Sequence, residues 1–319
     1  MRYISLFNHS DDLCDGICLS ETSIPKPASN EIHVRTLASP INPADINVIE
    51  GTYPILPSLP AVPGNEGVAE VIDPGDQNEI QKGDIVIAAN VPGWWSEHRI
   101  IPADKVYRLP PSIDHFQAAC LSVNPATAWR LIHDFVQLKP GDWIVINAAN
   151  SALGQSLNQI ARALDLKVVN LARRPSLVHG SDTVFDDDDS AIQQAKSCLN
   201  GASIKLAINQ VGGQSSRRLM KLLSPNGTMV TVGAMSKEPI TVSGGQLIFK
   251  NLILCGFWIT KWLDNAPRID IEKMYDSLAD LMIKKELEIS IDSSYPLEDY
   301  QSAIQHAKRS RKGKVILTF

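Results

Sequence analysis

The sequence lacks the features that mark nucleic-acid-binding and membrane-spanning proteins. Its 35 Asp and Glu residues outnumber 30 Lys and Arg, so a net charge of −5 leaves no basic excess to attract phosphate backbones or anionic lipids. No run of about eighteen apolar residues occurs, which predicts no membrane-crossing helix. Residues 1–6 show neither an apolar signal-peptide core nor an Arg- and Ser-rich transit pattern. We therefore expect a cytoplasmic protein that binds neither nucleic acid nor membranes.

Cysteine is also scarce and scattered. The five cysteines form an odd set, which predicts free, mostly buried thiols rather than a disulfide framework. Cys14 and Cys18 have the spacing of a possible ligand pair, but no second Cys or His pair at ligand spacing accompanies them. The sequence therefore predicts no bound metal.

The distribution of turn-forming residues predicts two domains in the 319 residues. The first 120 residues are rich in Pro, Gly and Asn around short β-type runs at 32–37, 67–72, 84–89 and 98–101. Short, irregularly spaced strands of this kind favour a compact β-barrel-like module. We expect residues 1–120, completed by the C-terminal segment 267–319, to form one domain and residues 121–266 to form the other.

The middle of the chain alternates strand and helix patterns, which predicts a parallel, doubly wound sheet. The expected strands are 143–147, 167–171, 183–185, 206–209, 228–232 and 252–256, with helices at 155–164, 191–199 and 215–223. The C-terminal segment should add a helix at 271–285, a strand at 290–295, a helix at 297–309 and a strand at 314–319.

The most informative segment runs from Val145 to Gly154. An apolar strand leads into a cluster of small residues, and a helical pattern follows. Small side chains at such a turn let the backbone approach a pyrophosphate and direct helix N–H groups toward it. The turn residues Asn150, Ser151, Ala152, Leu153 and Gly154 are therefore the predicted dinucleotide-binding site.

The end of the next expected strand indicates which dinucleotide is bound. A site that prefers NAD usually places an acidic residue there for the ribose 2′-hydroxyl, whereas this chain has Arg173 and Arg174. Two guanidinium groups suit a 2′-phosphate, so the residues favour NADPH. The alternative is a solvated pair of loop arginines.

Six blocks in the same order resemble the medium-chain dehydrogenase/reductase superfamily, and in detail its zinc-free trans-2-enoyl thioester reductases. These blocks are residues 42–54, 62–67, 123–128, 147–154, 229–235 and 256–260. The resemblance implies an α/β protein with a GroES-like β-barrel catalytic domain and a doubly wound Rossmann parallel sheet. Zinc alcohol dehydrogenases carry a histidine ligand where this chain has Asn65, so a catalytic metal is not expected.

The same resemblance assigns roles to further residues. It implies that Tyr53 is the catalytic acid, whose phenol stabilises or protonates the enolate formed when hydride reaches the β-carbon. Ala152, Val232 and Ala234 depart from the residues usual in the family. The remaining cofactor contacts that the resemblance implies are Asn124, Thr127, Val232, Gly233, Ala234, Met235, Phe257, Trp258, Ile259, Thr260 and Lys314.

Together these patterns predict an NADPH-dependent reductase of trans-2-enoyl thioesters, with coenzyme A or acyl carrier protein as the acyl carrier. The resemblance also implies a homodimer. Two alternatives remain open: an NADPH-dependent reductase of quinones or other activated alkenes, and a non-catalytic NADPH-binding protein.

Overall fold

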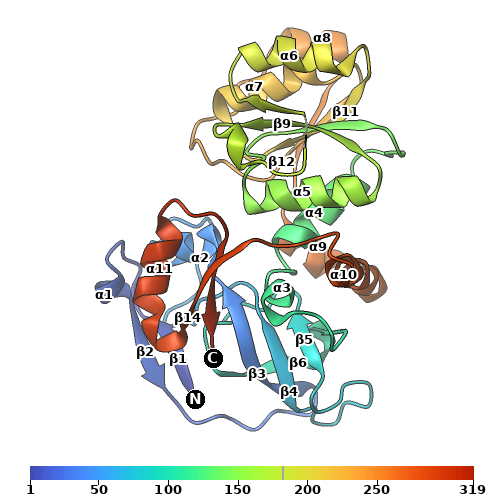
Figure 1. Cartoon of the computed structure of the whole chain (residues 1–319). Coiled ribbons are helices and arrows are strands. Elements are labelled where there is room, and N and C mark those ends of the chain that lie inside the picture. Colours follow the sequence, from blue (N-terminus) through green and yellow to red (C-terminus); the bar gives the residue numbers. More distant parts are fainter. Residues whose placement is uncertain (182) are drawn as a thin grey trace. The chain divides into compact units, whose positions relative to one another are not determined.

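The computed structural model describes residues 1–181 and 183–319, except for the side chains of Leu13 and Cys14. The chain forms two compact units (Figure 1). Unit 1 comprises Met1–Val123 and Trp262–Phe319, and unit 2 comprises Asn124–Lys261. Among the described residues, no helix is long and apolar enough to cross a membrane.

Unit 1 is built mainly from antiparallel strands. Its strands are β1 (Arg2–Leu6), β2 (Ile17–Glu21), β3 (Glu31–Pro40), β4 (Val68–Asp73), β5 (Ile85–Ala88), β6 (His98–Pro102), β7 (Val106–Leu109), β14 (Ile291–Pro296) and β15 (Lys314–Thr318). Its helices are α1 (Leu13–Gly16), α2 (Pro43–Ile49), α3 (His115–Ala119), α10 (Arg268–Ile283) and α11 (Tyr300–Lys308), with 3₁₀ turns η1 (Ala103–Lys105) and η3 (Leu297–Asp299).

The long strand β3 organises the main sheet of unit 1, whose strand order is β14-β15-β3-β4-β5-β7. Its first half also pairs with β6, and its last residues pair with β15, which aligns Pro40 with Ile316. The C-terminal segment is therefore an integral part of the sheet begun by the N-terminal residues.

Two adjacent tryptophans fill the interior of unit 1, because Trp94 and Trp95 are both fully buried. Gly64 makes room for them. A Cβ atom there would lie 2.5 Å from Cδ1 of Trp95, and the residue has a φ of +102°. Only glycine adopts that backbone conformation readily, so the turn before β4 depends on it.

Unit 2 is a three-layer α/β sandwich. Its strands are β8 (Trp143–Ile146), β9 (Lys167–Ala172), β10 (Val184–Asp186), β11 (Ile204–Asn209), β12 (Thr228–Thr231) and β13 (Ile253–Gly256). Its helices are α4 (Asn124–His133), α5 (Ala152–Ala163), α6 (Ser190–Leu199), α7 (Gly213–Leu222) and α8 (Gly244–Lys250), with the 3₁₀ turn η2 (Pro175–Leu177); α9 (Ile259–Asn265) links it to unit 1.

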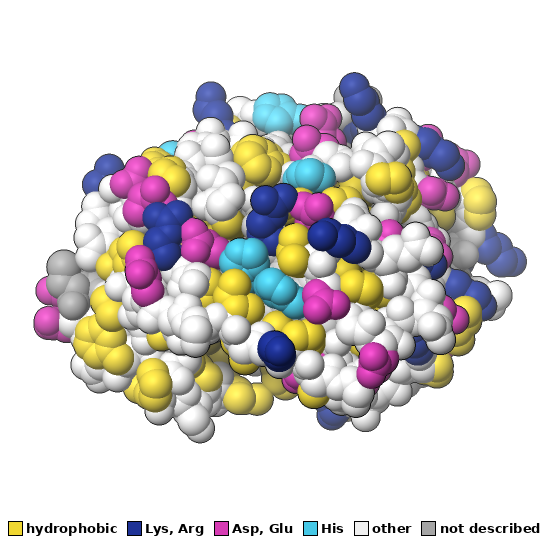
Figure 2. All heavy atoms as spheres, turned by 90° about the horizontal axis from the view of Figure 1, so that it is seen from below, with side chains coloured by type: hydrophobic (Ala, Val, Ile, Leu, Met, Phe, Trp, Pro, Cys, Tyr) yellow, Lys and Arg dark blue, Asp and Glu magenta, His cyan; other side chains and the backbone are white. Residues whose placement is uncertain are grey.

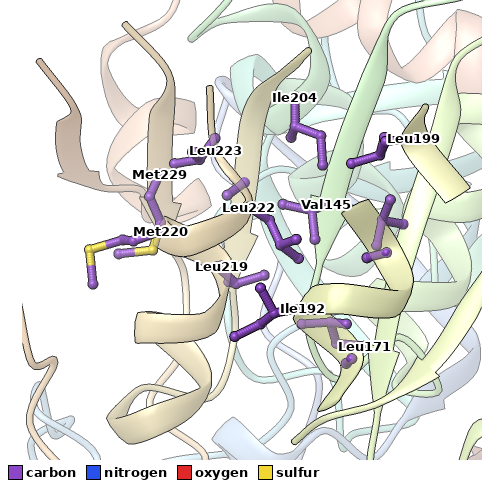
Figure 3. Close-up of a cluster of buried hydrophobic side chains, with 14 of the residues drawn as sticks. Val145, Leu171, Ile192, Leu199, Ile204, Leu219, Met220, Leu222, Leu223 and Met229 are labelled. Atoms are coloured by element: carbon purple, nitrogen blue, oxygen red, sulfur yellow. The ribbon is translucent and has the colours of Figure 1, made fainter. Parts of the chain in front are cut away.

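All neighbouring strands of the unit 2 sheet are parallel, in the order β10-β9-β8-β11-β12-β13. This is the Rossmann strand order, in which the chain changes direction between the first and fourth strands. Figure 1 shows α4 and α5 on one side of the sheet and α6 and α7 on the other. Side chains from α6 and α7 pack on β8, β9 and β11 in a continuous apolar core, part of which is drawn in Figure 3.

The structure confirms the predicted fold class and refines the elements. In the described part of the short interval after β9, the turn η2 is the one helical element, since Pro175 and Gly180 leave no room for a full crossover helix. Phe257 and Trp258 lie directly after β13, outside the predicted strand at 252–256. Helices α8 and α9 were not predicted.

The described cysteines are free thiols, as predicted, but only Cys120 of the four is fully buried. Cys18 and Cys255 are half-buried, and Cys198 is exposed. The side chain of Cys14, the other half of the possible ligand pair, lies outside the described part of the chain.

Candidate active site

A largely apolar pocket of about 580 Å³ lies within unit 1. Its wall includes Tyr53, Ile55 and Leu56 from the loop after α2, and Val62 and Asn65 from the segment before β4. Ser96, His98 and Arg99 line it as well. The pocket has the size and composition of a small-molecule site, with a few polar groups on apolar walls.

The loop after α2 carries Tyr53 into this pocket. Its backbone turns back on the helix, since the N–H groups of Thr52 and Tyr53 both donate to the carbonyl of Asn47, at 2.8 and 3.1 Å. Tyr53 is half-buried, whereas Ile55 and Leu56 beyond it are 60% and 40% exposed. The loop therefore presents a phenol and an apolar rim on the same side of unit 1.

Asp45 is a buried carboxyl group at the pocket wall. Its Oδ2 accepts the N–H of Asn42 at 2.7 Å, and its Oδ1 accepts the N–H of Asn65 at 2.9 Å. The carboxyl group thereby joins the start of α2 to the segment before β4. Burial, and to a smaller extent the nearby charge of Glu66, raise the pKa of Asp45 to about 7 against the lowering effect of the two N–H groups and of Lys314.

Behind Asp45 lies a second buried carboxylate. Oε1 of Glu66 accepts the side-chain amide of Asn42 at 2.8 Å, and its Oε2 accepts the N–H of Val123 at 2.8 Å. The ammonium group of Lys314 donates to Oδ1 of Asn42. All four side chains, Asn42, Asp45, Glu66 and Lys314, are at most 4% exposed. We call them the buried polar cluster.

The family resemblance implies that Lys314 contacts the cofactor, but its side chain lies inside unit 1. Its side chain is 4% exposed and directed into the buried polar cluster, where Oδ1 of Asn42 accepts a hydrogen bond from its ammonium group. A contact with a cofactor phosphate remains a prediction, and the structure gives this ammonium group an internal partner instead.

The small-residue turn of unit 2 has the geometry of an anion site. Ser151 is the N-cap of α5, and its hydroxyl accepts the N–H of Gly154 at 2.9 Å. A Cβ atom at Gly154 would lie 2.6 and 2.7 Å from the carbonyl oxygens of Ala149 and Ala148, so no larger residue fits. Asn150, Ala152 and Leu153 are half-buried at the start of the helix. This cradle fits a dinucleotide pyrophosphate.

A buried amide network fixes the ends of β8 and β11, where the chain changes direction. The side chain of Asn147 donates to Asn209 and Ser215 at 2.9 and 2.8 Å and accepts the N–H of Gln210 at 2.7 Å. Gln210 in turn accepts the hydroxyl of Ser151 at 2.8 Å. The network thus holds the anion turn in register with the sheet, at the place where ligands bind in this topology.

Arg173 and Arg174 follow the last residue of β9, as predicted, and both are exposed. Guanidinium groups at this strand end have the chemistry that suits a ribose 2′-phosphate.

The other predicted cofactor residues all lie in unit 2. Asn124 and Thr127 are on the first turn of α4, where Thr127 is buried and Asn124 half-buried. Residues 232–235 follow β12 and become progressively more exposed toward Met235. Residues 257–260 follow β13, and the ring of Phe257 packs edge-on against Phe135 at 5.7 Å. The carboxyl ends of β8, β9, β12 and β13 therefore carry most of the predicted set.

Sequence patterns did not single out Asp45 and Glu66 as functional candidates. The available signal was the spacing of Asn42 and Asp45, which fits a helix N-cap and its third residue. A second signal was an isolated lysine at the start of an otherwise apolar strand. Nothing in the sequence indicates that these segments meet, because the four residues are spread over 272 positions.

The fold and the two sites define a class: this chain is a medium-chain dehydrogenase/reductase, with a barrel-type catalytic unit and a Rossmann dinucleotide-binding unit. Residues 28–111 match the alcohol dehydrogenase GroES-like domain, and residues 152–282 match the zinc-binding dehydrogenase family. In the described part of the chain no group of three or more His, Cys, Asp or Glu residues could hold a metal ion.

Sequence comparison narrows the class. The chain is 40% identical over 317 residues to the mitochondrial enoyl-[acyl-carrier-protein] reductase of Xenopus tropicalis, covering 94% of this chain and 91% of that protein. It therefore belongs to the family of the mitochondrial enoyl-[acyl-carrier-protein] reductases.

Solved structures agree with this assignment. The Etr1p complex with NADP and crotonyl-CoA has a TM-score of 0.88 and 28% identity, with 100% of this chain and 99% of that chain covered. Escherichia coli quinone oxidoreductase with NADPH has a TM-score of 0.86 and 25% identity, with both chains covered completely.

The expectation of a cytoplasmic protein is wrong. The relatives from Xenopus tropicalis, Rattus norvegicus and Arabidopsis thaliana are all named as mitochondrial enzymes. The pattern of the first residues was a poor predictor of the cellular location, because such patterns describe a targeting signal and not the folded enzyme.

Proposed function

We propose that this protein reduces the C=C bond of trans-2-enoyl thioesters with NADPH. The observation that carries the proposal is a phenol on an apolar pocket in unit 1, in a chain whose unit 2 has a Rossmann anion turn followed by two arginines. Its family relatives are named enoyl-[acyl-carrier-protein] reductases, and Etr1p was solved with NADP and crotonyl-CoA.

The residues of unit 2 fit the cofactor. The N-terminus of α5 would hold the pyrophosphate, and Gly154 allows the close approach that this requires. Arg173 and Arg174 would bind the 2′-phosphate and so select NADPH over NADH. When bound, NADPH supplies a hydride to the β-carbon of the substrate.

The residues of unit 1 handle the substrate and the proton. Apolar side chains such as Ile55, Leu56 and Val62 would bind the acyl chain and exclude water. Negative charge develops on the thioester oxygen as the enolate forms. The hydroxyl of Tyr53 stabilises this charge and protonates the α-carbon, which is the general-acid role that a neutral phenol can fill.

Oxidation of NADPH, followed by absorbance, tests the proposal directly. Crotonyl-CoA and crotonyl-acyl carrier protein should each support turnover, whereas a quinone should give far less. Faster turnover with the quinone would favour a second candidate function, NADPH-dependent quinone reduction. The similarity to Escherichia coli quinone oxidoreductase supports testing this candidate. NADPH binding without turnover on any of these substrates would indicate a non-catalytic protein.

The protein is further proposed to be a homodimer. Strand β13 ends the unit 2 sheet, and Ile253 on it is 57% exposed. On the preceding helix α8, Ile248 and Phe249 are 73% and 87% exposed. An unpaired strand edge beside exposed apolar side chains is suited to isologous pairing with a second copy. A heterodimer of the related Etr1p and Etr2p from Candida tropicalis has been solved.

A mitochondrial location is also proposed, on the names of the relatives. Import of the full-length protein into isolated mitochondria, or its absence from them, would test this.

A further inference from the structure

The buried polar cluster contains more acidic groups than basic groups, and the proposed reaction gives this excess of acid no role. It contains two carboxyl groups, Asp45 and Glu66, and one ammonium group, Lys314, all shielded from solvent. If all three were ionised, the cluster would carry a net negative charge in a medium that solvates it poorly. One additional proton makes the cluster neutral, which is the favoured state for buried charges.

Three charged or titratable groups that line the same pocket as Asp45 have partners of their own: Arg99 donates to the carbonyls of Val91 and Pro92, His98 hydrogen-bonds His33, and the N-terminal ammonium donates to Thr22. Among the other side chains around the cluster, Cys120 and Tyr275 face it, and burial raises the pKa of both, so that they stay neutral. The remaining contacts of the two carboxyl groups in the described part of the chain are neutral N–H donors from Asn42, Asn65, Ser122 and Val123. The extra proton therefore resides on one of the two carboxyl groups.

Only one of these carboxyl groups can exchange the proton with a ligand. Asp45 lines the same pocket as Tyr53, whereas Glu66 is not among the residues that line this pocket. Burial raises the pKa of Glu66 as well, and that of Asp45 to about 7. An acid with a pKa near the working pH is suited to both giving and regaining a proton.

We propose that Asp45 is a second acid of the reductase, which stores the proton that each turnover consumes and delivers it to Tyr53. The inference rests on the proposed function. An acyl chain that fills the apolar pocket displaces the water that would otherwise reprotonate Tyr53, so the proton has to come from a group on the pocket wall. Asp45 is such a group, because it lines the same pocket as Tyr53.

Hydride adds to the β-carbon, the nicotinamide is oxidised, and the C=C bond becomes an enolate. The O–H bond of Tyr53 breaks as a C–H bond forms at the α-carbon, and the resulting phenolate takes a proton from the carboxylic acid of Asp45. Solvent reprotonates the Asp45 carboxylate once the product has left, so each turnover consumes one hydride and one proton.

The first experiment detects the stored proton without using activity. Infrared spectra of the full chain labelled with ¹³C at the aspartate carboxyl carbon are recorded across the pH range. We expect a carboxylic-acid band that disappears as the pH rises through about 7 in the wild type. The band should be absent in Asp45→Asn and retained in Asp114→Asn. Asp114 is the matched control, because its carboxylate also accepts two backbone N–H groups but lies at the exposed start of α3.

The second experiment uses steady-state turnover of crotonyl-CoA with NADPH. Asp45→Asn should lower kcat at least about tenfold, the lower part of the range for losing a general acid. It should also raise the solvent deuterium isotope effect and remove the fall of kcat above neutral pH. A purely structural role would not change the isotope effect or the shape of the pH profile.

Each outcome distinguishes the inference from the proposed function. Absence of a protonated-aspartate band in the wild type at pH 6 overturns the inference even if Asp45→Asn does not fold. Wild-type turnover with an unchanged pH profile and isotope effect in Asp45→Asn overturns it while leaving the reductase assignment intact. No enoyl thioester turnover by the wild type, with or without the band, refutes the proposed function itself.

Discussion

At the scale of single residues, the proposed reduction depends on a few polar side chains that line the apolar pocket of unit 1. Tyr53 is held by a loop that hydrogen-bonds back to the end of α2, and it lines the pocket with Asp45. We therefore expect the hydroxyl group of Tyr53 to contribute to turnover and not to the stability of the fold.

Replacing Tyr53 by phenylalanine should lower turnover at least about tenfold, because the enolate loses its hydrogen-bond donor. NADPH binding, measured by fluorescence titration, should persist, since the proposed cofactor site lies in unit 2. Tyr295→Phe is the matched control, since that phenol hydrogen-bonds His306 at 2.9 Å and does not line the pocket. Turnover like that of the wild type in Tyr53→Phe would remove this residue from the mechanism.

Gly154 supports a second prediction at this scale. In Gly154→Ala the added methyl group meets two backbone carbonyl oxygens, which cannot move without displacing the anion turn. We expect a loss of about 1–3 kcal/mol in the free energy of unfolding, as for other overpacked sites, together with weaker NADPH binding. Gly244→Ala is the control, because a Cβ atom there would have no neighbour within 4 Å. Equal effects of the two substitutions in denaturant titrations would contradict the close-approach argument.

At the scale of elements, we propose that the carboxyl end of β9 determines which dinucleotide is bound. The strand brings Arg173 and Arg174 to the edge where parallel strands present their ligands, and it leaves both exposed.

We expect NADPH to be preferred over NADH by at least about tenfold in kcat/KM, since each guanidinium can make charge-assisted hydrogen bonds to a 2′-phosphate. Arg173→Ala and Arg174→Ala, made separately, should reduce kcat/KM for NADPH and leave that for NADH nearly unchanged. Arg217→Ala provides the control, as an exposed arginine of α7 in the same unit. Equal use of both cofactors by the wild type would refute the role of the arginine pair.

At the scale of the whole molecule, assembly and stability follow from what is exposed and what is buried. Charges of both signs are interspersed on the face shown in Figure 2, which offers no continuous field of one sign to drive association. The exposed apolar side chains of α8 and β13 are therefore the stronger candidates for self-association.

Phe249→Glu should convert the proposed homodimer into monomers, because a carboxylate would replace an apolar ring that is 87% exposed in the single chain. Sedimentation velocity measures the change directly. Ile269→Glu on α10 is the control, since Ile269 is also more than half exposed but belongs to unit 1. A wild type that sediments as a monomer at all concentrations would refute the dimer.

Stability should also depend on pH through Asp45. Its pKa is higher in the folded protein, about 7, than its ordinary value of 3.8. The folded state thus binds the proton more tightly, so the free energy of unfolding falls as pH rises from about 4 to about 7 and levels above that. The Tm of the wild type should accordingly fall relative to that of Asp45→Asn between about pH 5 and pH 8. A constant difference in Tm between the wild type and Asp45→Asn across this range would show that Asp45 of the folded protein is ionised throughout it.

Much of this protein was predictable from local patterns. Hydrophobic periodicity located every strand of the unit 2 sheet to within a few residues, because period-2 and period-3.6 patterns record which side chains face a core. Likewise, small residues between Asn147 and Gly154 predicted the anion turn, because backbone approach to a ligand is a local requirement that the residues there must meet.

The tertiary structure decided what depends on distant segments meeting. Asn42, Glu66 and Lys314 are unremarkable in their own segments, and only the pairing of β15 with β3 brings the lysine to the start of α2. The raised pKa of Asp45 likewise comes from burial by segments far away in the chain. Local sequence specifies the shape of an element and the residues at its ends. Desolvation and charge balance arise from the sum of all neighbours, which exists only in the folded molecule.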